Sequence, residues 1–293
     1  MSHVAEPLRR SDFRFAHRLR VRWVEVDLQQ IVFNGHYLMY FDTAIADYWR
    51  ALGLPYQASM QQLGGDLYVR KSTVEYHASA RYDEQLEVTI RCQHIGNSSI
   101  RFVCAIFRAE QLLISGELVY VFADPATQTS RPVPLALREI LLGFEAGEEM
   151  VEVQVGGWAE LGEAAGAIRT EVFVREQQIP ADLEWDSADA TCLHALAINR
   201  LGLPLATGRL LPADEHGAAK LGRMAVIATM RGGQVGRQVL EALIDAARAR
   251  GDREVVLHAQ RSAIGFYLRA GFHARGEAFE EAGIPHQEMV RAC

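Results

Sequence analysis

A carboxylate stands a short distance before a helix in the N-terminal part of the chain. Asp27 comes just after a strand-like segment and about seven residues before an apolar helix. A carboxylate there could act as a nucleophile or general base at a carbonyl carbon, and the unpaired amides of the first helical turn could polarise the carbonyl oxygen. The pattern therefore predicts an acyl-transfer site. The alternative is that Asp27 only stabilises a loop or caps the helix.

A glycine-rich segment in the C-terminal part, "RGGQVGR" at residues 231–237, leads directly into a second helix. Val235, Val239 and Leu243 recur every fourth residue of that helix, which is typical of an amphipathic helix. A glycine-rich helix start exposes several amides to an anion, so the segment could hold a pyrophosphate; the alternative is an ordinary turn. Gln234 stands where the close approach of a phosphate favours glycine, and it fits only if its φ stays negative.

The elements around Asp27 are strands and one long helix. Apolar and polar residues alternate in "LEVTIRCQHI" (86–95), and "IRFVCAIF" (100–107) follows after the short turn "GNSS", which predicts an antiparallel hairpin. "HYLMYFDTAIADYWRAL" (36–52) has apolar residues at helical spacing over nearly its whole circumference, and Gly53 ends it. We therefore expect a single helix wrapped by a curved antiparallel sheet.

The C-terminal half has a different pattern. Strand periodicity stops between residues 124 and 158, where we expect turns, a short helix and an acidic exposed stretch. Strands and helices alternate after that, which predicts a mixed α/β domain. We place the boundary near Gly147, giving domains of residues 1–146 and 147–293. The halves share no repeat, so the chain is interpreted as a fusion.

The composition is that of a soluble two-domain protein, with 293 residues, 49% of them hydrophobic and 23% charged. The net charge of -7 and the lack of a basic patch or tail in the sequence argue against a nucleic-acid partner, although they leave room for local basic pockets. We expect a cytoplasmic protein without a membrane partner, since the first fifteen residues have no apolar core of a signal peptide and no segment has 18 uninterrupted apolar residues. The four cysteines form no CxxC pair, so we expect reduced thiols and no metal site.

Two stretches in the first half carry a family resemblance. "RVRWVEVDLQQIVFNGHYLMYFD" (20–42) and "STVEYHASARYDEQLEV" (72–88) resemble the hotdog-fold acyl-CoA thioesterases of the 4-hydroxybenzoyl-CoA thioesterase type, over residues 15–124. The resemblance implies that Asp27 attacks the thioester or activates water, and that an amide near Asn34 polarises its carbonyl. It also implies a homodimer or tetramer. The family usually has Gly where this chain has Gln30.

A series of motifs in the second half of the chain carries a second family resemblance. "VFVREQ", "GRMAV", "RGGQVGR", "GFYLRAGF" and "AGIPH" occur in this order and resemble a bacterial subgroup of the GNAT acetyltransferases, over residues 155–291. The resemblance implies that Tyr267 protonates the leaving thiolate. It further implies that the CoA pyrophosphate binds at Arg231, Gly232, Gly233, Gln234, Val235 and Gly236, and the pantetheine at Met224, Ala225 and Val226.

The proton of an incoming amine has no assigned acceptor. Glu184, Asp186, Asp189 and His258 are candidates, although "DLEWDSAD" (182–189) could equally be a solvated acidic loop or a stretch that attracts a cationic amine. His286 could reach the substrate or be structural.

We therefore predict a hotdog domain followed by a GNAT domain, and a bifunctional enzyme. Its substrates would be acyl-CoA or acetyl-CoA and an amine acceptor. The alternative is a thioesterase regulated by a GNAT-like domain that senses CoA without catalysis.

Overall fold

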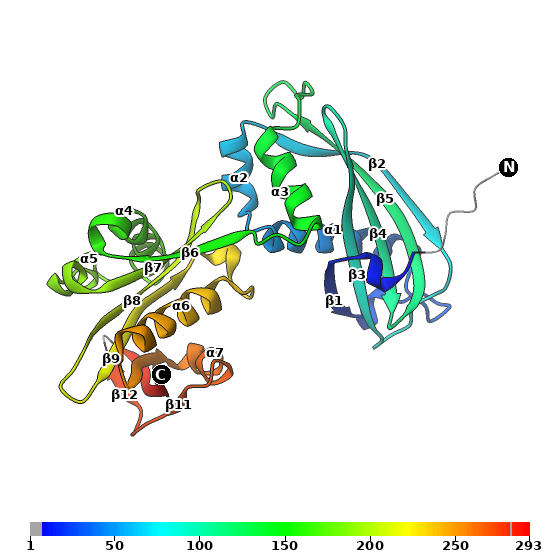
Figure 1. Ribbon diagram of the computed structural model, residues 1–293. Helices are drawn as coiled ribbons and strands as arrows, with labels where there is room; N and C mark the ends of the chain where they lie inside the picture. The colour runs from blue at the N-terminus through cyan, green and yellow to red at the C-terminus, as the bar shows by residue number, and fades with distance from the viewer. Residues whose placement is uncertain (1–7, 282) are drawn as a thin grey trace. The chain divides into compact units, whose positions relative to one another are not determined.

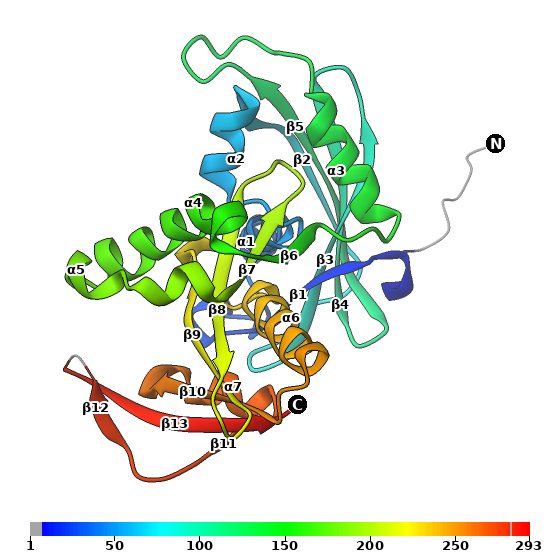
Figure 2. The ribbon, with the colours of Figure 1, turned by 60° about the vertical axis from the view of Figure 1, so that its left-hand side comes forward.

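The computed structural model describes residues 8–281 and 283–293. The first residue of the "AGIPH" motif, Ala282, and most of the N-terminal stretch inspected for a signal peptide lie outside the described residues. The chain forms two compact units, Met1–Met150 and Val151–Cys293. Figures 1 and 2 show both from two directions, coloured along the chain.

The first unit is built on a five-stranded antiparallel sheet with strand order β1-β3-β4-β5-β2. Its strands are β1 (Phe15–Arg20), β2 (Asp66–Tyr76), β3 (Gln85–Ile95), β4 (Ser99–Arg108) and β5 (Gln111–Ala123). Its helices are η1 (Arg10–Asp12), η2 (Trp23–Glu25), α1 (Asn34–Ala51), α2 (Tyr56–Leu63) and α3 (Leu135–Glu145). The predicted β3–β4 hairpin is confirmed, and Gly96 N donates to Ser99 O across its turn at 2.8 Å.

The long helix α1 packs against one face of this sheet, as predicted (Figure 1). Tyr48 is fully buried, and its ring makes edge contacts with Phe102 of β4 and Phe144 of α3. The helix is not covered all round, however, because the side chains of Leu38 and Met39 are 40% and 54% exposed. The apolar residues therefore serve two purposes: one row forms the core, and a second lines the surface beside the helix start.

The second unit contains an eight-stranded sheet of order β11-β13-β10-β9-β8-β7-β6, with β12 paired to β13 (Figure 2). The strands are β6 (Val151–Gly156), β7 (Leu193–Asn199), β8 (Pro204–Ala213), β9 (Ala218–Val226), β10 (Glu254–Gln260), β11 (His273–Ala274), β12 (Phe279–Glu281) and β13 (Ile284–Ala292). The helices are α4 (Trp158–Arg169), η3 (Thr170–Glu176, a π-helix), α5 (Ala181–Glu184), η4 (Ser187–Thr191), η5 (Ala228–Met230), α6 (Val235–Arg250), η6 (Arg261–Ala263) and α7 (Ile264–Arg269). Only β9 and β10 pair in parallel among the described strands.

In the second unit, the predicted apolar row of α6 is present, and a strand that was not predicted, β6, is present as well. The apolar row of α6 is confirmed, since Val239, Leu243 and Ala247 are fully buried in the core of the unit. The expectation that strands stop between residues 124 and 158 is wrong, because β6 pairs antiparallel with β7. Val151 and Val153 of β6 pack on the core. The strand was missed because it directly follows the acidic stretch and lies at the sheet edge.

No helix among the described residues is both long and apolar enough to cross a membrane. Cys92, Cys104 and Cys192 are buried free thiols, and burial raises the pKa of the Cys92 thiol to about 12. A thiol that stays protonated is a poor nucleophile, so these residues fill the cores.

Candidate active sites

Asp27 lies in a tight turn between β1 and α1. Its backbone N–H donates to Ile31 O at 2.9 Å, and Gln30 N donates back to Asp27 O at 2.9 Å. The side-chain oxygen Oδ1 accepts from Gln29 N at 2.8 Å. Among the described residues Oδ2 has no hydrogen-bond donor. The turn thus fixes one carboxylate oxygen and leaves the other available.

The turn is closed by a residue in the left-handed region. Gln30 has a φ of 60°, where glycine is the favoured residue because it lacks a Cβ atom. This is the position at which the resembled thioesterases usually have Gly. Gln30 is therefore strained in this turn, and a glycine at this position would not be.

The ends of the turn are anchored by a buried carboxylate that sequence reasoning missed. The Glu25 side chain is only 3% exposed and accepts from Arg22 N at 2.7 Å and from the Tyr40 hydroxyl at 2.8 Å. The Glu25 carbonyl also accepts from Phe33 N at 2.9 Å. Burial alone would raise the pKa of Glu25, but the bonds from Arg22 and Tyr40 outweigh it and lower the pKa. Glu25 therefore bonds the strand side of the loop to the helix.

The helix start lies at the other end of the same loop. The residue before the helix, Phe33, provides no side-chain cap. The backbone N–H groups of Asn34 and Gly35 consequently have no acceptor among the described residues. The structure brings Asp27 and Asn34 to one loop–helix junction, where a carboxylate and open amides occur together.

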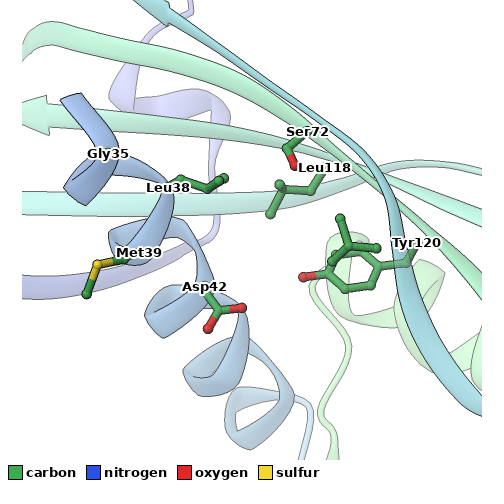
Figure 3. Close-up of a pocket in the computed structure, with 8 residues that line it drawn as sticks. Gly35, Leu38, Met39, Asp42, Ser72, Leu118 and Tyr120 are labelled. Carbon is green, nitrogen blue, oxygen red and sulfur yellow. The ribbon is translucent and has the colours of Figure 1, made fainter.

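A cavity of about 290 Å³ adjoins this helix start. Figure 3 shows Leu38 of α1 pointing toward Leu118 of β5, and the Tyr120 hydroxyl pointing toward the helix. Its eight lining residues are Gly35, Leu38, Met39, Asp42, Val69, Ser72, Leu118 and Tyr120. The pKa of the Tyr120 hydroxyl is raised by burial and by the nearby Asp42 carboxylate. The cavity is thus mostly apolar with a few polar groups.

In the glycine-rich loop of the second unit, Gln234 has the negative φ that a residue other than glycine needs at this position. Its φ is −88°, so a side chain is tolerated there. Gly232 has a φ of 80°, and Gly236 packs so closely that a Cβ atom would lie 3.0 Å from Val226 Cγ2. The backbone N–H groups from Gly232 to Gly236 have no acceptor among the described residues. These amides stand open at the N-terminus of α6, as an anion site requires.

The Arg231 side chain is engaged differently from what the motif suggested. Its Nε donates to Val226 O at 2.9 Å, and Nη1 and Nη2 donate to the two oxygens of Glu176 at 2.5 and 2.6 Å. The bond to Glu176 is the first cause that raises the pKa of Arg231, and it likewise lowers the pKa of Glu176. Sequence reasoning missed this partner, although Glu176 is the glutamate of "VFVREQ".

The strand before the loop diverges from its parallel neighbour. The last residue pair between β9 and β10 is Leu221 with Leu257, so residues 222–226 of β9 lie beyond the pairing. Within this stretch Arg223 has a φ of 53°, and the register with β8 shifts between Thr207 and Arg209. The bulge reorients the backbone of Met224, Ala225 and Val226. These are the residues expected to meet pantetheine.

Most of the four residues considered as acceptors of the amine's proton are held in ion pairs. Arg169 bonds Glu184 at 2.5 Å and Asp189 at 2.8 Å, and Arg209 bonds Asp186 at 2.7 Å. The reading of residues 182–189 as a solvated acidic loop is therefore wrong for Glu184 and Asp189, which are buried. The bond from Arg209 comes first among the causes that lower the pKa of Asp186 to about 2. Asp186 is therefore a poor general base, whereas burial raises the pKa of Glu184 despite its bond to Arg169.

Tyr267 is placed on α7 within the core of the second unit. It is 7% exposed, its ring contacts Phe272, and its hydroxyl has no hydrogen-bond partner among the described residues. Burial raises the pKa of Tyr267 to about 12, so the hydroxyl stays protonated at neutral pH. His258 lies 4.0 Å from Glu288, and His286 Nδ1 lies 2.8 Å from Ile284 O. Among the described residues no cluster of three His, Cys, Asp or Glu could hold a metal ion.

Each half of the chain matches the model of a known protein family. Residues 29–115 match the model of the thioesterase superfamily, and residues 208–293 match that of the acetyltransferase (GNAT) domain. The chain is 35% identical over 125 residues to the uncharacterized N-acetyltransferase YjcF of Bacillus subtilis, which covers 42% of this chain and 87% of that protein. It is 29% identical over 124 residues to the acyl-CoA thioester hydrolase YbgC of Shigella flexneri, covering 42% of this chain and 92% of that protein.

A solved structure is also similar in the second half. The crystal structure of a putative N-acetyltransferase from Lactobacillus plantarum is 30% identical, with a TM-score of 0.46, and covers 49% of this chain and 99% of that one. Together with the two family matches, the sequence relatives confirm both resemblances. The chain belongs through its C-terminal half to the GNAT acetyltransferases and carries in its N-terminal half a hotdog domain of the thioesterase superfamily.

Proposed function

We propose that the chain is a bifunctional CoA-ester enzyme, with an acyl-CoA thioesterase in residues 1–146 and a GNAT N-acyltransferase in residues 147–293. The observation that carries the first activity is the junction at α1. There the Asp27 carboxylate has one oxygen held and one open, and the amides of Asn34 and Gly35 have no acceptor in the described residues.

In the thioesterase reaction, the open Asp27 oxygen attacks the thioester carbonyl or takes a proton from an attacking water. A backbone N–H near Asn34 donates a hydrogen bond to the carbonyl oxygen and stabilises the negative charge that develops on it. The carbon–sulfur bond then breaks. When Asp27 acts as the base, the proton it took from water goes to the departing CoA thiolate, and the water oxygen becomes part of the carboxylic acid. When Asp27 is the nucleophile, a mixed anhydride forms, the thiolate takes a proton from water, and a second water hydrolyses the anhydride to restore the carboxylate. We propose that the neighbouring cavity of about 290 Å³ receives a short or single-ring acyl group, since its lining is largely apolar and its volume is small.

Two copies of the chain are proposed to assemble through the hotdog unit. β2 lies at one edge of its sheet, and its residues Val69 and Tyr76 are 53% and 56% exposed. A long exposed edge strand with apolar side chains is suited to pairing with another strand. The exposed Leu38 and Met39 lie near this edge through the cavity that Val69 also lines.

In the transferase reaction, the pyrophosphate of acetyl-CoA or another acyl-CoA is proposed to bind the open amides of residues 232–236. The backbone of Met224 to Val226, past the β9–β10 pairing, aligns the pantetheine and the acyl carbonyl. A neutral amine attacks that carbonyl, the carbon–nitrogen bond forms and the carbon–sulfur bond breaks, and the proton that the nitrogen loses passes through water to restore the Tyr267 hydroxyl. Tyr267 gives its proton to the departing thiolate, because its hydroxyl is protonated and unpaired within the described residues.

The alternative, a CoA-sensing domain without catalysis, requires no proton donor. The protonated and unpaired Tyr267 hydroxyl therefore supports a transferase over a sensor. The bond between the Arg231 guanidinium and Glu176 does not contradict this, because the amides of residues 232–236 are open to phosphate within the described residues whether or not that bond is present.

The test is a comparison of wild type, Asp27→Ala and Tyr267→Phe in two assays. Thiol release from a panel of acyl-CoA esters reports hydrolysis, and acetyl transfer to a panel of amines reports the second activity. We expect Asp27→Ala to abolish hydrolysis and keep transfer, and Tyr267→Phe to do the reverse. Unchanged hydrolysis in Asp27→Ala on every ester would remove Asp27 from the mechanism. CoA binding without transfer to any amine would favour the sensor.

A further inference from the structure

The ion pair between Arg231 and Glu176 connects two segments that are far apart in sequence. Both side chains are 41% exposed, so the pair is neither buried nor fully solvated. Arg231 is the first residue of the proposed pyrophosphate loop, and its Nε is also bonded to Val226 O at the end of β9. Glu176 is the last residue of the π-helix η3.

The residue after Glu176 reaches the neighbouring strand. The Gln177 side-chain oxygen accepts from Gln260 Nε2 at 3.3 Å, and Gln260 is the last residue of β10. β9 and β10 no longer pair beyond Leu221 and Leu257. Glu176 is linked to the end of β9 through Arg231, and Gln177 bonds directly to the end of β10. The proposed thioester lies along one of these ends. Glu176 is thus placed at the end of the strands where acyl transfer is proposed.

When CoA binds, its phosphates compete with the Glu176 carboxylate for the Arg231 guanidinium. A guanidinium binds carboxylate and phosphate with the same bidentate geometry. Phosphates arriving at the amides of residues 232–236 come next to Arg231 in the chain. An exposed ion pair contributes little free energy and is weakened by a nearby dianion.

We propose, resting on the transferase function above, that CoA phosphates take Arg231 from Glu176 and that the freed Glu176 carboxylate then binds an ammonium group of the acceptor, next to the neutral nitrogen that is acylated. Acyl-CoA and amine consequently bind in that order. The acceptor class that this selects is a cationic amine.

The other carboxylates of this region support the choice of Glu176. Glu184, Asp186 and Asp189 are each bonded to an arginine that has no phosphate role, and Glu288 is bonded to Arg275. CoA binding releases none of them. Among the described residues Glu176 has a single ionic partner, Arg231 of the proposed CoA loop. CoA binding therefore changes Glu176 from paired to unpaired before the amine binds.

The experiment follows CoA binding at the loop itself, in the full chain. Hydrogen–deuterium exchange of peptides that cover residues 228–240 is measured at increasing concentrations of CoA, which the thioesterase cannot hydrolyse. We expect CoA to protect the loop, and Glu176→Gln to lower the half-protection concentration by about threefold to fivefold at low ionic strength. Arg231→Gln should raise it, and the double variant should match Arg231→Gln alone.

Glu171→Gln is the matched control, because Glu171 pairs with Arg175 in the same π-helix at 2.9 Å and does not bond the loop. It should leave the half-protection concentration unchanged. A CoA affinity that is equal or weaker in Glu176→Gln overturns the competition between phosphate and carboxylate, while the transferase function stands. A loop that CoA does not protect in wild type overturns both.

The amine is tested in the Asp27→Asn background, where hydrolysis no longer consumes acetyl-CoA. For each amine in the panel that wild type acetylates, Glu176→Gln should raise the KM about tenfold or more while its CoA affinity improves. These opposite signs distinguish ammonium binding from a structural role, which would weaken both. An unchanged KM for cationic amines overturns the assignment of Glu176 to the acceptor.

Discussion

The Tyr40 hydroxyl donates to the buried Glu25 carboxylate at 2.8 Å, so the second turn of α1 is bonded to the segment that leads into the Asp27 loop. The same carboxylate also accepts from Arg22. The position of Asp27 relative to the helix start therefore depends on a side chain two residues before it.

Replacing Tyr40 by Phe removes this bond and leaves a buried carboxylate with one donor fewer. We expect unfolding free energy to fall by about 1–3 kcal/mol and thioester hydrolysis to fall more through kcat than through KM, because the alignment of Asp27 loosens. Urea unfolding and steady-state kinetics measure the two effects. Tyr82→Phe is the control, since Tyr82 is 53% exposed. Equal losses in both variants would contradict a specific role for the Tyr40–Glu25 bond.

The left-handed Gln30 offers a stabilising substitution. Its φ of 60° costs a non-glycine residue about 1 kcal/mol, part of which glycine loses again through greater freedom in the unfolded chain. We expect Gln30→Gly to raise the unfolding free energy by some tenths of a kcal/mol, roughly 0.5, with hydrolysis retained. Gln29→Gly, at a residue without positive φ, should instead destabilise. A destabilised Gln30→Gly would show that the glutamine side chain makes a compensating interaction.

The glycines of the CoA loop should respond unequally to a methyl group. At Gly236 a Cβ atom would lie 3.0 Å from Val226 Cγ2, whereas at Gly233 the nearest atom, Met230 O, lies at an ordinary 3.5 Å. We expect Gly236→Ala to lose about 1–3 kcal/mol of stability and to weaken CoA binding by separating α6 from β9. Gly233→Ala should fold with near wild-type stability. Thermal melting and loop protection by CoA are the measurements, and similar behaviour of the two variants would be inconsistent with this packing.

The arginine–carboxylate cluster of the second unit should make its stability depend on acid. The pKa of Asp186 is lowered to about 2, chiefly by its bond to Arg209, from an ordinary value of 3.8. A carboxyl whose folded pKa is depressed contributes stability above its unfolded pKa, and the contribution is lost as pH falls from about 4 toward 2. We expect Asp186→Asn to flatten the decline of unfolding free energy in that window. Asp182→Asn is the control, and the same flattening there would contradict the assignment to Asp186.

The elements that could be predicted from the sequence are those with a regular local pattern of apolar residues. The α6 row of Val239, Leu243 and Ala247 and the β3–β4 hairpin depend on local periodicity, which the sequence displays directly. β6 has the same alternation but is short and edge-placed, so its pairing with β7 depends on a partner some 40 residues away. Long-range pairing of this kind is not visible in a local pattern.

Site residues that belong to a sequence motif could be predicted. Their hydrogen-bond partners could not, because the fold brings those partners together. Asp27 and the loop at residues 231–236 were found from their motifs, and their chemical roles stay predictions. The Glu25–Tyr40 and Glu176–Arg231 bonds, by contrast, join residues whose spacing in sequence carries no signal. The burial of Glu184 and Asp189 was missed for the same reason, because their arginines come from other elements.

The π-helix that ends at Glu176 makes the direction of this carboxylate depend on the type of helix. A π-helix holds one more residue than an α-helix of the same hydrogen-bonded span. A segment one residue shorter than Thr170–Glu176 could therefore be α-helical over the same span and still present its glutamate to Arg231. A segment of unchanged length that became α-helical would instead turn its glutamate by about 100° about the helix axis. Relatives that have seven residues here in an α-helix should therefore lack the link between their two substrates.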